Sequence, residues 1–328
     1  MFRVAPVRFA SILLSISLWL AACGSSSVAT LDGTAISETA LSDLHVDVSR
    51  LKEDELVSSI LLLLLHNAFI ARADRDFAVS LDDAMVESFY AGRTERWRTP
   101  DEVELGLAAR NERPSRVRLE SELDTVRDEV SAHLVRSESP GFDLAKAYNA
   151  YLIDNARVCV LQIQLESPGQ YDETKARLDA GEAFADVALD VSLDPFVGRE
   201  DGGVGTGGDI GCSAPAALPT GMDAAVLVAP IGEAYGPITS NIGVHLVWVV
   251  ERDAPALDEV RPAVIEHAVT RQGPDLFRVW AVEVLQTMDV EIADQYGVWG
   301  MLPETDPVPT VVPPARVDQI VGGASLGD

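Results

Sequence analysis

The sequence is poor in basic residues and in cysteine, and each shortage excludes a class of protein. Its 328 residues contain 25 Lys and Arg against 52 Asp and Glu, a formal net charge of −27 at pH 7. So acidic a chain lacks the broad positive surface that nucleic-acid binding requires. Anionic lipid surfaces also repel it, so a tie to a membrane has to be covalent or a hydrophobic span. Three cysteines are too few for a disulfide-rich scaffold.

Long apolar runs are also missing from the body of the chain. After residue 23 the longest is Ile60 to Leu65, which is too short to cross a bilayer. Global disorder is excluded, because 47% of the residues are hydrophobic and only 23% are charged. At roughly 100–200 residues per domain, the length corresponds to about two domains.

The N-terminus carries a mostly apolar segment, Phe9 to Leu20, behind Arg3 and Arg8. A basic start followed by a short apolar core is typical of a signal peptide. The segment ends in Leu20-Ala-Ala-Cys23 and a Gly/Ser tether, which resembles the lipobox of bacterial lipoproteins. The resemblance implies removal of residues 1–22, lipid on Cys23, and an exported protein anchored at the extracytoplasmic face of the cell membrane. A plain secretory signal with an incidental cysteine is the alternative.

Helical patterns dominate residues 30–156. The Asp32-Gly33 pair between apolar residues predicts a hairpin, and Ser37 is placed to cap a helix toward Arg50. Further helices are expected over 53–75, from a capping box at 80–83 to Tyr90, and over 101–111, 115–136 and 143–155. These patterns predict a helical domain over residues 23–156.

The character of the sequence changes at Arg157, where a β-rich segment begins. Strands are expected over 158–165, 234–238 and 244–250, helices over 172–191 and 216–228, and a glycine-rich loop over 198–211. This order predicts a compact α+β unit at 157–252, a small antiparallel sheet flanked by helices. Segment 253–298 reads as a C-terminal helix, broken near Gly273-Pro274, that returns to the helical domain. The Pro-rich end, 299–328, predicts a disordered tail.

Several motifs in residues 157–251 together resemble the parvulin family of peptidyl-prolyl cis–trans isomerases. They are Arg157 at the strand opening, Gly181-Glu-Ala-Phe184, Ser192-Leu-Asp194, Gly207-Gly-Asp-Ile-Gly211, Gly236-Pro237 and Gly243-Val-His245. Each is short, and their order and spacing carry the resemblance. The flanking segments, 28–156 and 257–298, resemble more loosely the chaperone part of SurA- and PrsA-type foldases. The fold implied is α+β, a helical chaperone domain joined to a parvulin-like domain.

The resemblance implies a site that eases rotation about an X-Pro bond without breaking it. The rotation barrier is about 18–20 kcal/mol, and uncatalysed exchange takes tens to hundreds of seconds. An apolar pocket for the proline ring is implied at Ile210, Leu218 and Met222, and polar groups around the carbonyl at Asp194, Ser240 and His245. Ordinary core or turn roles are the alternative for each residue. No metal and no cofactor are implied.

One position departs from the family pattern. Many parvulins carry a histidine in the first strand, and the pattern assigns that position to Val160, which offers neither donor nor acceptor. Two functions therefore stay open, an isomerase acting on unfolded or nascent exported polypeptides and a chaperone or holdase whose parvulin domain is catalytically degenerate. A structural or adaptor lipoprotein of the cell envelope is the third alternative.

Two smaller expectations concern the same unit. Residues 167–174 contain no Lys or Arg, so we expect no preference for phosphorylated Ser/Thr-Pro sites. Cys159 and Cys212 form either a disulfide, which export allows, or two buried thiols.

Overall fold

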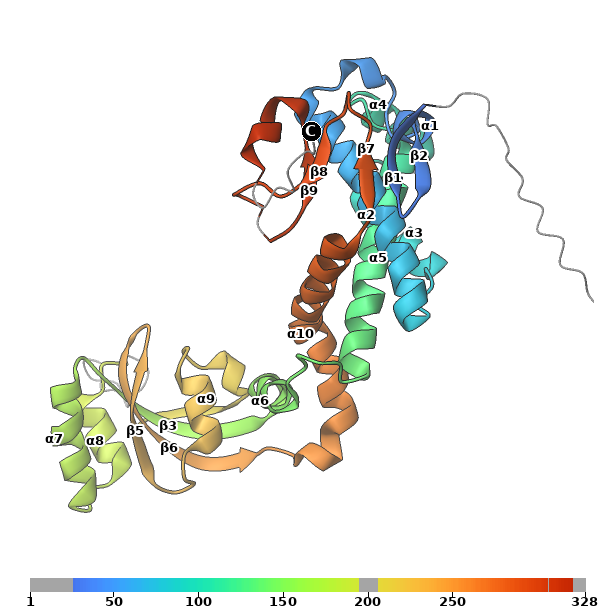
Figure 1. Ribbon diagram of the computed structural model, residues 1–328. Coiled ribbons are helices and arrows are strands. Elements are labelled where there is room, and N and C mark those ends of the chain that lie inside the picture. Colours follow the sequence, from blue (N-terminus) through green and yellow to red (C-terminus); the bar gives the residue numbers. More distant parts are fainter. Residues whose placement is uncertain (1–25, 195–205, 306, 321–328) are drawn as a thin grey trace, which may run out of the picture. The chain divides into compact units, whose positions relative to one another are not determined.

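The computed structural model describes residues 26–194, 206–305 and 307–320 (Figure 1). It divides into two compact units. The first comprises the described residues up to 65, together with 97–117 and those from 288 onward. The second comprises 66–96 and the described part of 118–287. The signal-peptide and lipidation predictions at 1–22 and Cys23 lie outside the described residues.

The first unit contains a three-stranded antiparallel sheet in the order β2-β1-β7 (Figure 1). Its strands are β1 (Ser27–Leu31), β2 (Thr34–Ser37) and β7 (Val290–Ile292). Asp32 and Gly33 join β1 to β2 with φ values of 48° and 76°. This left-handed pair suits Asp-Gly and confirms the predicted hairpin.

Helices of the first unit begin at recognisable caps. Ser37 accepts a hydrogen bond from the Ala40 amide and opens α1 (Glu38–Ser42). The expected continuation to Arg50 is wrong, because the chain turns and Asp47 caps a separate 3₁₀ segment, η1 (Val48–Arg50). The helix α4 (Pro100–Ala108) lies wholly in this unit, which also holds the first parts of α2 (Glu53–Phe77) and α5 (Pro114–Arg136).

The helix α2 holds an 18-residue window with a mean hydropathy of 1.7. By length and composition alone it is the one helix in the described ranges apolar enough to cross a membrane. Ile60 and Leu64 are nevertheless completely buried by other parts of the protein, which is the environment of a core helix.

The C-terminal segment is folded over residues 299–305 and 307–320, so the expectation of a disordered tail is wrong there. The strand β8 (Val298–Gly300) pairs with β9 (Thr310–Val312), and η3 (Pro314–Gln319) follows. Leu302, Val311 and Val312 are buried, so the apolar residues between the prolines supply a core. Residues 321–328 lie outside the described part.

The second unit contains long helices beside the sheet domain. They are α3 (Asp83–Thr94), α6 (Leu144–Asn155), α10 (Leu257–Thr287) and the later parts of α2 and α5. The cap of α3 is Asp82, which accepts from the Met85 amide. The helix α10 continues through Pro262 and Pro274, so the predicted break is absent. A Cβ on Gly273 would lie 2.9 Å from the Ser131 Cβ, so close packing against α5 accompanies the continuous helix.

The α+β unit is a four-stranded antiparallel sheet in the order β4-β3-β6-β5. Its strands are β3 (Arg157–Leu165), β4 (Asp209–Ser213), β5 (Ala234–Ser240) and β6 (Gly243–Asp253). The helices are α7 (Pro168–Asp179), α8 (Phe184–Val191), the 3₁₀ turn η2 (Pro215–Ala217) and α9 (Met222–Val228). The predicted fold class is confirmed, and β4 adds a strand where the sequence predicted part of a loop.

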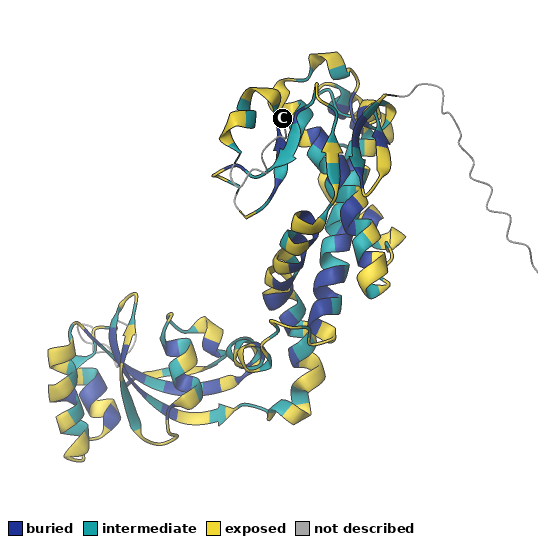
Figure 2. Ribbon diagram, viewed as in Figure 1, coloured by how far each residue is buried: buried dark blue, intermediate teal, exposed yellow. Residues whose placement is uncertain are grey.

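Alternate residues of β3 and β6 point to opposite faces of this sheet, as a pleated strand requires. Val158, Val160 and Val247 pack in one apolar cluster with residues of α9. Ile163, Leu165 and Leu246 pack in a second with residues of α8. Figure 2 shows the buried residues along both strands. Because each face has its own helix and core, the register of β3 determines which side chains reach the face of α9.

Candidate active site

His245 on β6 is the most deeply buried of the predicted polar site residues, with no solvent exposure. Its Nε2 lies 2.6 Å from the Oγ of Ser240, the last residue of β5. Ser240 pairs directly with Gly243 across the turn between the two strands. The structure therefore brings two of the three predicted polar residues into contact through a short β-hairpin.

The electrostatics of His245 favour a neutral ring. Burial lowers the pKa of His245, and the negative charge of Asp194 acts in the opposite direction. Nδ1 has no hydrogen-bond partner in the part of the chain that the structure describes. Ser240 Oγ accepts from the Ile242 amide at 3.1 Å, and its hydroxyl proton has two acceptors within reach, His245 Nε2 and the Gly243 carbonyl oxygen at 3.4 Å.

Asp194 is held by a residue that the motif analysis did not select. Its Oδ2 accepts a hydrogen bond of 2.5 Å from the Nε2 of Gln162 on β3, which is buried. Gln162 pairs with Val247, and Gln164 pairs with His245, so Gln162 and His245 lie on the same face of the sheet. Asp194, whose charge acts on His245, thus belongs with it to one polar group on this face.

The register also places Val160, the position assigned to the family histidine. Val160 lies opposite Val249 and inside the apolar cluster, two residues before Gln162. The first-strand side chain that contacts Asp194 is Gln162. The signal in the sequence was the pair of glutamines at alternate positions of an otherwise apolar strand. It was not decisive, because pairing with β6 sets the register.

The three predicted pocket residues lie in or against one apolar cluster, and Ile210 also packs against the second cluster. Met222 is fully buried, while Ile210 on β4 and Leu218 after η2 are partly buried and pack against the same cluster. Val247, two residues from His245 on the same strand face, is also a member. The structure therefore gathers Ile210, Leu218 and Met222 on the face that carries the polar group.

Gly221 allows the start of α9 to approach β5. Its φ is 98°, and a Cβ there would lie 2.5 Å from the carbonyl oxygen of Thr239. A side chain is excluded on both grounds. The approach sets Met222, the next residue, beside the end of β5 that carries Ser240.

A disulfide joins Cys159 on β3 to Cys212 on β4. The two residues are direct partners in the antiparallel pair. Of the two alternatives that the sequence left open, the structure therefore contains the disulfide. It links the strand of Gln162 to the strand of Ile210.

Comparison with known families identifies the α+β unit that contains these residues. Residues 166–251 match the rotamase family model described as the PPIC-type PPIase domain. The segment is a PPIC-type peptidyl-prolyl isomerase domain. The match begins directly after β3, so the strand of Gln162 lies outside it. The PPIC-type domain match includes the polar residues Asp194, Ser240 and His245. It also includes the predicted pocket residues Ile210, Leu218 and Met222.

Relatives with known names extend the likeness beyond this domain. Foldase protein PrsA from Geobacillus sp. (strain WCH70) is 24% identical over 177 residues, 52% of this chain and 62% of that protein. Foldase protein PrsA from Geobacillus kaustophilus (strain HTA426) is 31% identical over 81 residues, 25% of this chain and 27% of that protein. Chaperone SurA from Methylobacillus flagellatus is 26% identical over 137 residues, 40% of this chain and 30% of that protein. The chain therefore spans less than two thirds of the length of these curated relatives.

One solved structure supports the same architecture. The crystal structure of the peptidylprolyl isomerase PrsA from Bacillus cereus covers 83% of this chain and 95% of its own length. The TM-score is 0.52 at 15% sequence identity, which shows a shared fold. The chain is thus homologous to PrsA and SurA foldases through its PPIC-type domain and has a PrsA-like arrangement of elements.

Proposed function

We propose that this protein is a lipid-anchored extracytoplasmic foldase that isomerises X-Pro bonds in exported, unfolded polypeptides. The main support is the contact of buried His245 with Ser240, on the sheet face that also carries the apolar cluster of Met222. The PPIC-type domain supports the reaction class, and relatives named foldase and chaperone support an unfolded polypeptide as substrate. The Leu20-Ala-Ala-Cys23 sequence supports export and lipidation.

The proposed mechanism needs no bond cleavage. Rotation about the X-Pro bond passes through a twisted amide that has lost its resonance, and a catalyst must bind this form more tightly than either planar form. Ile210, Leu218 and Met222 would hold the proline ring. Ser240 and His245 would present fixed dipoles to the rotating carbonyl in a poorly solvated site. Since no group has to gain or lose a proton, a neutral His245 suits this role.

A protease-free isomerisation assay on the purified full-length protein tests the proposal. Tetrapeptides that vary the residue before proline should isomerise faster with the enzyme. His245→Ala should lower kcat/KM by about tenfold or more, equivalent to about 1.4 kcal/mol of transition-state stabilisation. Lys146→Gln, an exposed position in α6, is the matched control and should keep full activity. No acceleration with any peptide would overturn the catalytic proposal.

Val160 favours one alternative, a chaperone or holdase with a degenerate site. A valine, which offers neither donor nor acceptor, stands at the position that the resemblance assigns to a histidine. Suppression of client aggregation separates the two functions, since a holdase needs no rotation catalysis. Full suppression by the protein and by His245→Ala, without acceleration of any peptide, would select the holdase.

A further inference from the structure

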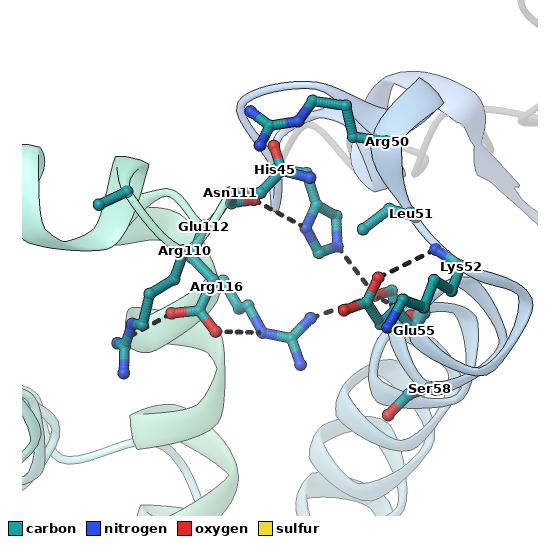
Figure 3. A pocket seen from close by; sticks show the side chains of 12 residues that line it. His45, Arg50, Leu51, Lys52, Glu55, Ser58, Arg110, Asn111, Glu112 and Arg116 are labelled. Atoms are coloured by element: carbon teal, nitrogen blue, oxygen red, sulfur yellow. Dashed lines mark hydrogen bonds and ion pairs between the residues drawn. The ribbon is translucent and has the colours of Figure 1, made fainter.

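The first unit contains a cavity of about 340 Å³ (Figure 3). Its walls come from the segment between α1 and α2, the first turns of α2, and the connection from α4 into α5. A cavity of this volume lies within the range of sites that take small ligands, roughly 300–1,000 Å³. None of the residues argued above for prolyl isomerisation lines it.

The charge of the lining is opposite to that of the whole chain. Four basic residues line the cavity against two acidic ones, Glu55 and Glu112, whereas acidic residues outnumber basic ones 52 to 25 in the sequence. The basic residues are Arg50, Lys52, Arg110 and Arg116. A local cationic excess in an acidic protein concentrates field lines on an incoming anion.

The cations differ in how far they are already neutralised. Glu112 forms ion pairs with Arg110 at 2.9 Å and with Arg116 at 3.9 Å. Arg50 and Lys52 are exposed, and their side chains form no ion pair with any residue in the described ranges. Figure 3 shows both at the cavity. The charge of Arg50 also acts on nearby Asp47, and neither cation forms an ion pair within the described ranges.

A buried histidine forms the inner wall. His45 is 5% exposed, with Nδ1 3.1 Å from the Asn111 carbonyl oxygen and Nε2 2.8 Å from Ser59 Oγ. Since a carbonyl only accepts, Nδ1 carries a proton. Ser59 Oγ also accepts from Arg116 at 3.1 Å and lies 2.7 Å from the Glu55 carbonyl oxygen. Its hydroxyl therefore has two acceptors, Nε2 of a neutral ring or, once the ring is protonated, the Glu55 carbonyl.

The groups around His45 shift its pKa in opposite directions. Burial lowers the pKa of His45 and Arg116 lowers it further, while the Asn111 hydrogen bond, Glu112 and Glu55 raise it. Arg113 donates to the backbone oxygen of His45 at 2.6 Å. Burial is the largest effect, so the neutral ring is favoured. A bound anion would offset the neighbouring arginines and favour the protonated ring.

We propose that this cavity binds an oxyanion, a phosphate or sulfate group held by Arg50 and Lys52 with Arg116 behind it, and that protonation of His45 tightens binding. Guanidinium and ammonium groups are the usual partners of such oxygens. The group can belong to a free ion or to a small organic phosphate, since the cavity exceeds a single phosphate. This proposal is independent of prolyl isomerisation.

Calorimetric titration of the purified full-length protein with sodium sulfate, at ionic strength held constant with NaCl, tests the site. Sulfate keeps its charge over the range used, whereas a phosphomonoester titrates at a pKa of about 6. We expect saturable binding that Arg50→Gln/Lys52→Gln weakens by about tenfold or more. Lys146→Gln should leave it unchanged. A parallel titration with glycerol 3-phosphate distinguishes the two sources of the oxyanion. Tighter binding than sulfate indicates a site for an organic phosphate, and equal or weaker binding indicates a site for a free ion.

The coupling to His45 has its own readout. Lowering the pH from about 8 to about 5.5, across the usual histidine pKa of about 6.5, should tighten sulfate binding. NMR titration of the His45 ring should give a higher pKa with saturating sulfate than without it, as linkage requires. Absence of saturable binding, or equal loss in Lys146→Gln, would overturn the site. An unshifted His45 pKa would overturn the coupling.

Discussion

At the scale of single residues, the site depends on which side chain of β3 reaches Asp194. Gln162 does so from a buried position, and its amide donates to the carboxylate. Val160, two residues earlier, lies in the apolar cluster. Both side chains lie on the same face of the sheet, but Gln162 positions Asp194 whereas Val160 packs in the core.

Replacing Gln162 by leucine should weaken the polar group without removing the fold. The half-buried Asp194 carboxylate would lose a donor, and a hydrogen bond to a charged group contributes about 1.5–3 kcal/mol. We expect kcat/KM for X-Pro peptides to fall by about tenfold. Val160→Ala is the matched control on the same strand face. It should lower stability, because it deletes core volume, yet keep activity per folded molecule. Equal activity loss in both variants would count against a positioning role for Gln162.

Two buried histidines give the protein a pH-dependent stability. Burial lowers the pKa of both His45 and His245. The folded state therefore binds fewer protons than the unfolded state near the usual histidine pKa of about 6.5. This contribution to the free energy of unfolding is complete above that pH and decreases as the pH falls below it. Urea unfolding at about pH 8 and about pH 5.5 should show the decrease, and His245→Gln should reduce it. An unchanged pH dependence in the variant would exclude His245 as a source.

At the scale of elements, the packing of α5 against α10 depends on a residue without a side chain. A Cβ at Gly273 would lie 2.9 Å from the Cβ of Ser131. The prediction of a break at Gly273-Pro274 used only local propensity, in which glycine and proline end helices. The contact with α5 outweighs that propensity.

Gly273→Ala should therefore destabilise the protein by about 1–3 kcal/mol, the usual range for overpacking. Gly92 in α3 is the matched control, because an added Cβ there has no atom within 4 Å among the described residues. Gly92→Ala should stabilise by about 0.5–1 kcal/mol through helix propensity. Thermal unfolding of the two variants should shift Tm in opposite directions. Shifts of the same sign would contradict the packing argument.

At the scale of the whole molecule, the proposed anchor lies at Cys23. Lipid attachment would add apolar chains to a protein of net charge −27, and each buried methylene contributes about 0.8 kcal/mol to membrane binding. We expect the protein from a bacterial host to fractionate with membranes and to have an intact mass that lacks residues 1–22 and includes lipid. Cys23→Ser should be recovered without lipid. A wild-type protein in the soluble fraction, with no added mass, would contradict lipidation and favour a plain secretory signal.

Local patterns in the sequence were sufficient where the interactions are local. The hairpin at Asp32-Gly33 and the Ser37 cap follow from residues close together along the chain. Ser240 and His245 were selected through the resemblance to the parvulin family, and their contact is local because only five positions separate them. In the hairpin and the cap, backbone preference acts over a few residues, so the local sequence contains the whole cause.

Contacts between distant segments decided the rest. The partner of Asp194 is Gln162, 32 residues away, because pairing of β3 with β6 sets which residues share a face. Val311 and Val312 are buried although prolines flank their segment. The helix α10 passes through Pro274 while Gly273 packs on Ser131. Burial and register are properties of the assembled chain, and the free energy they supply exceeds the local preferences from which sequence patterns are read.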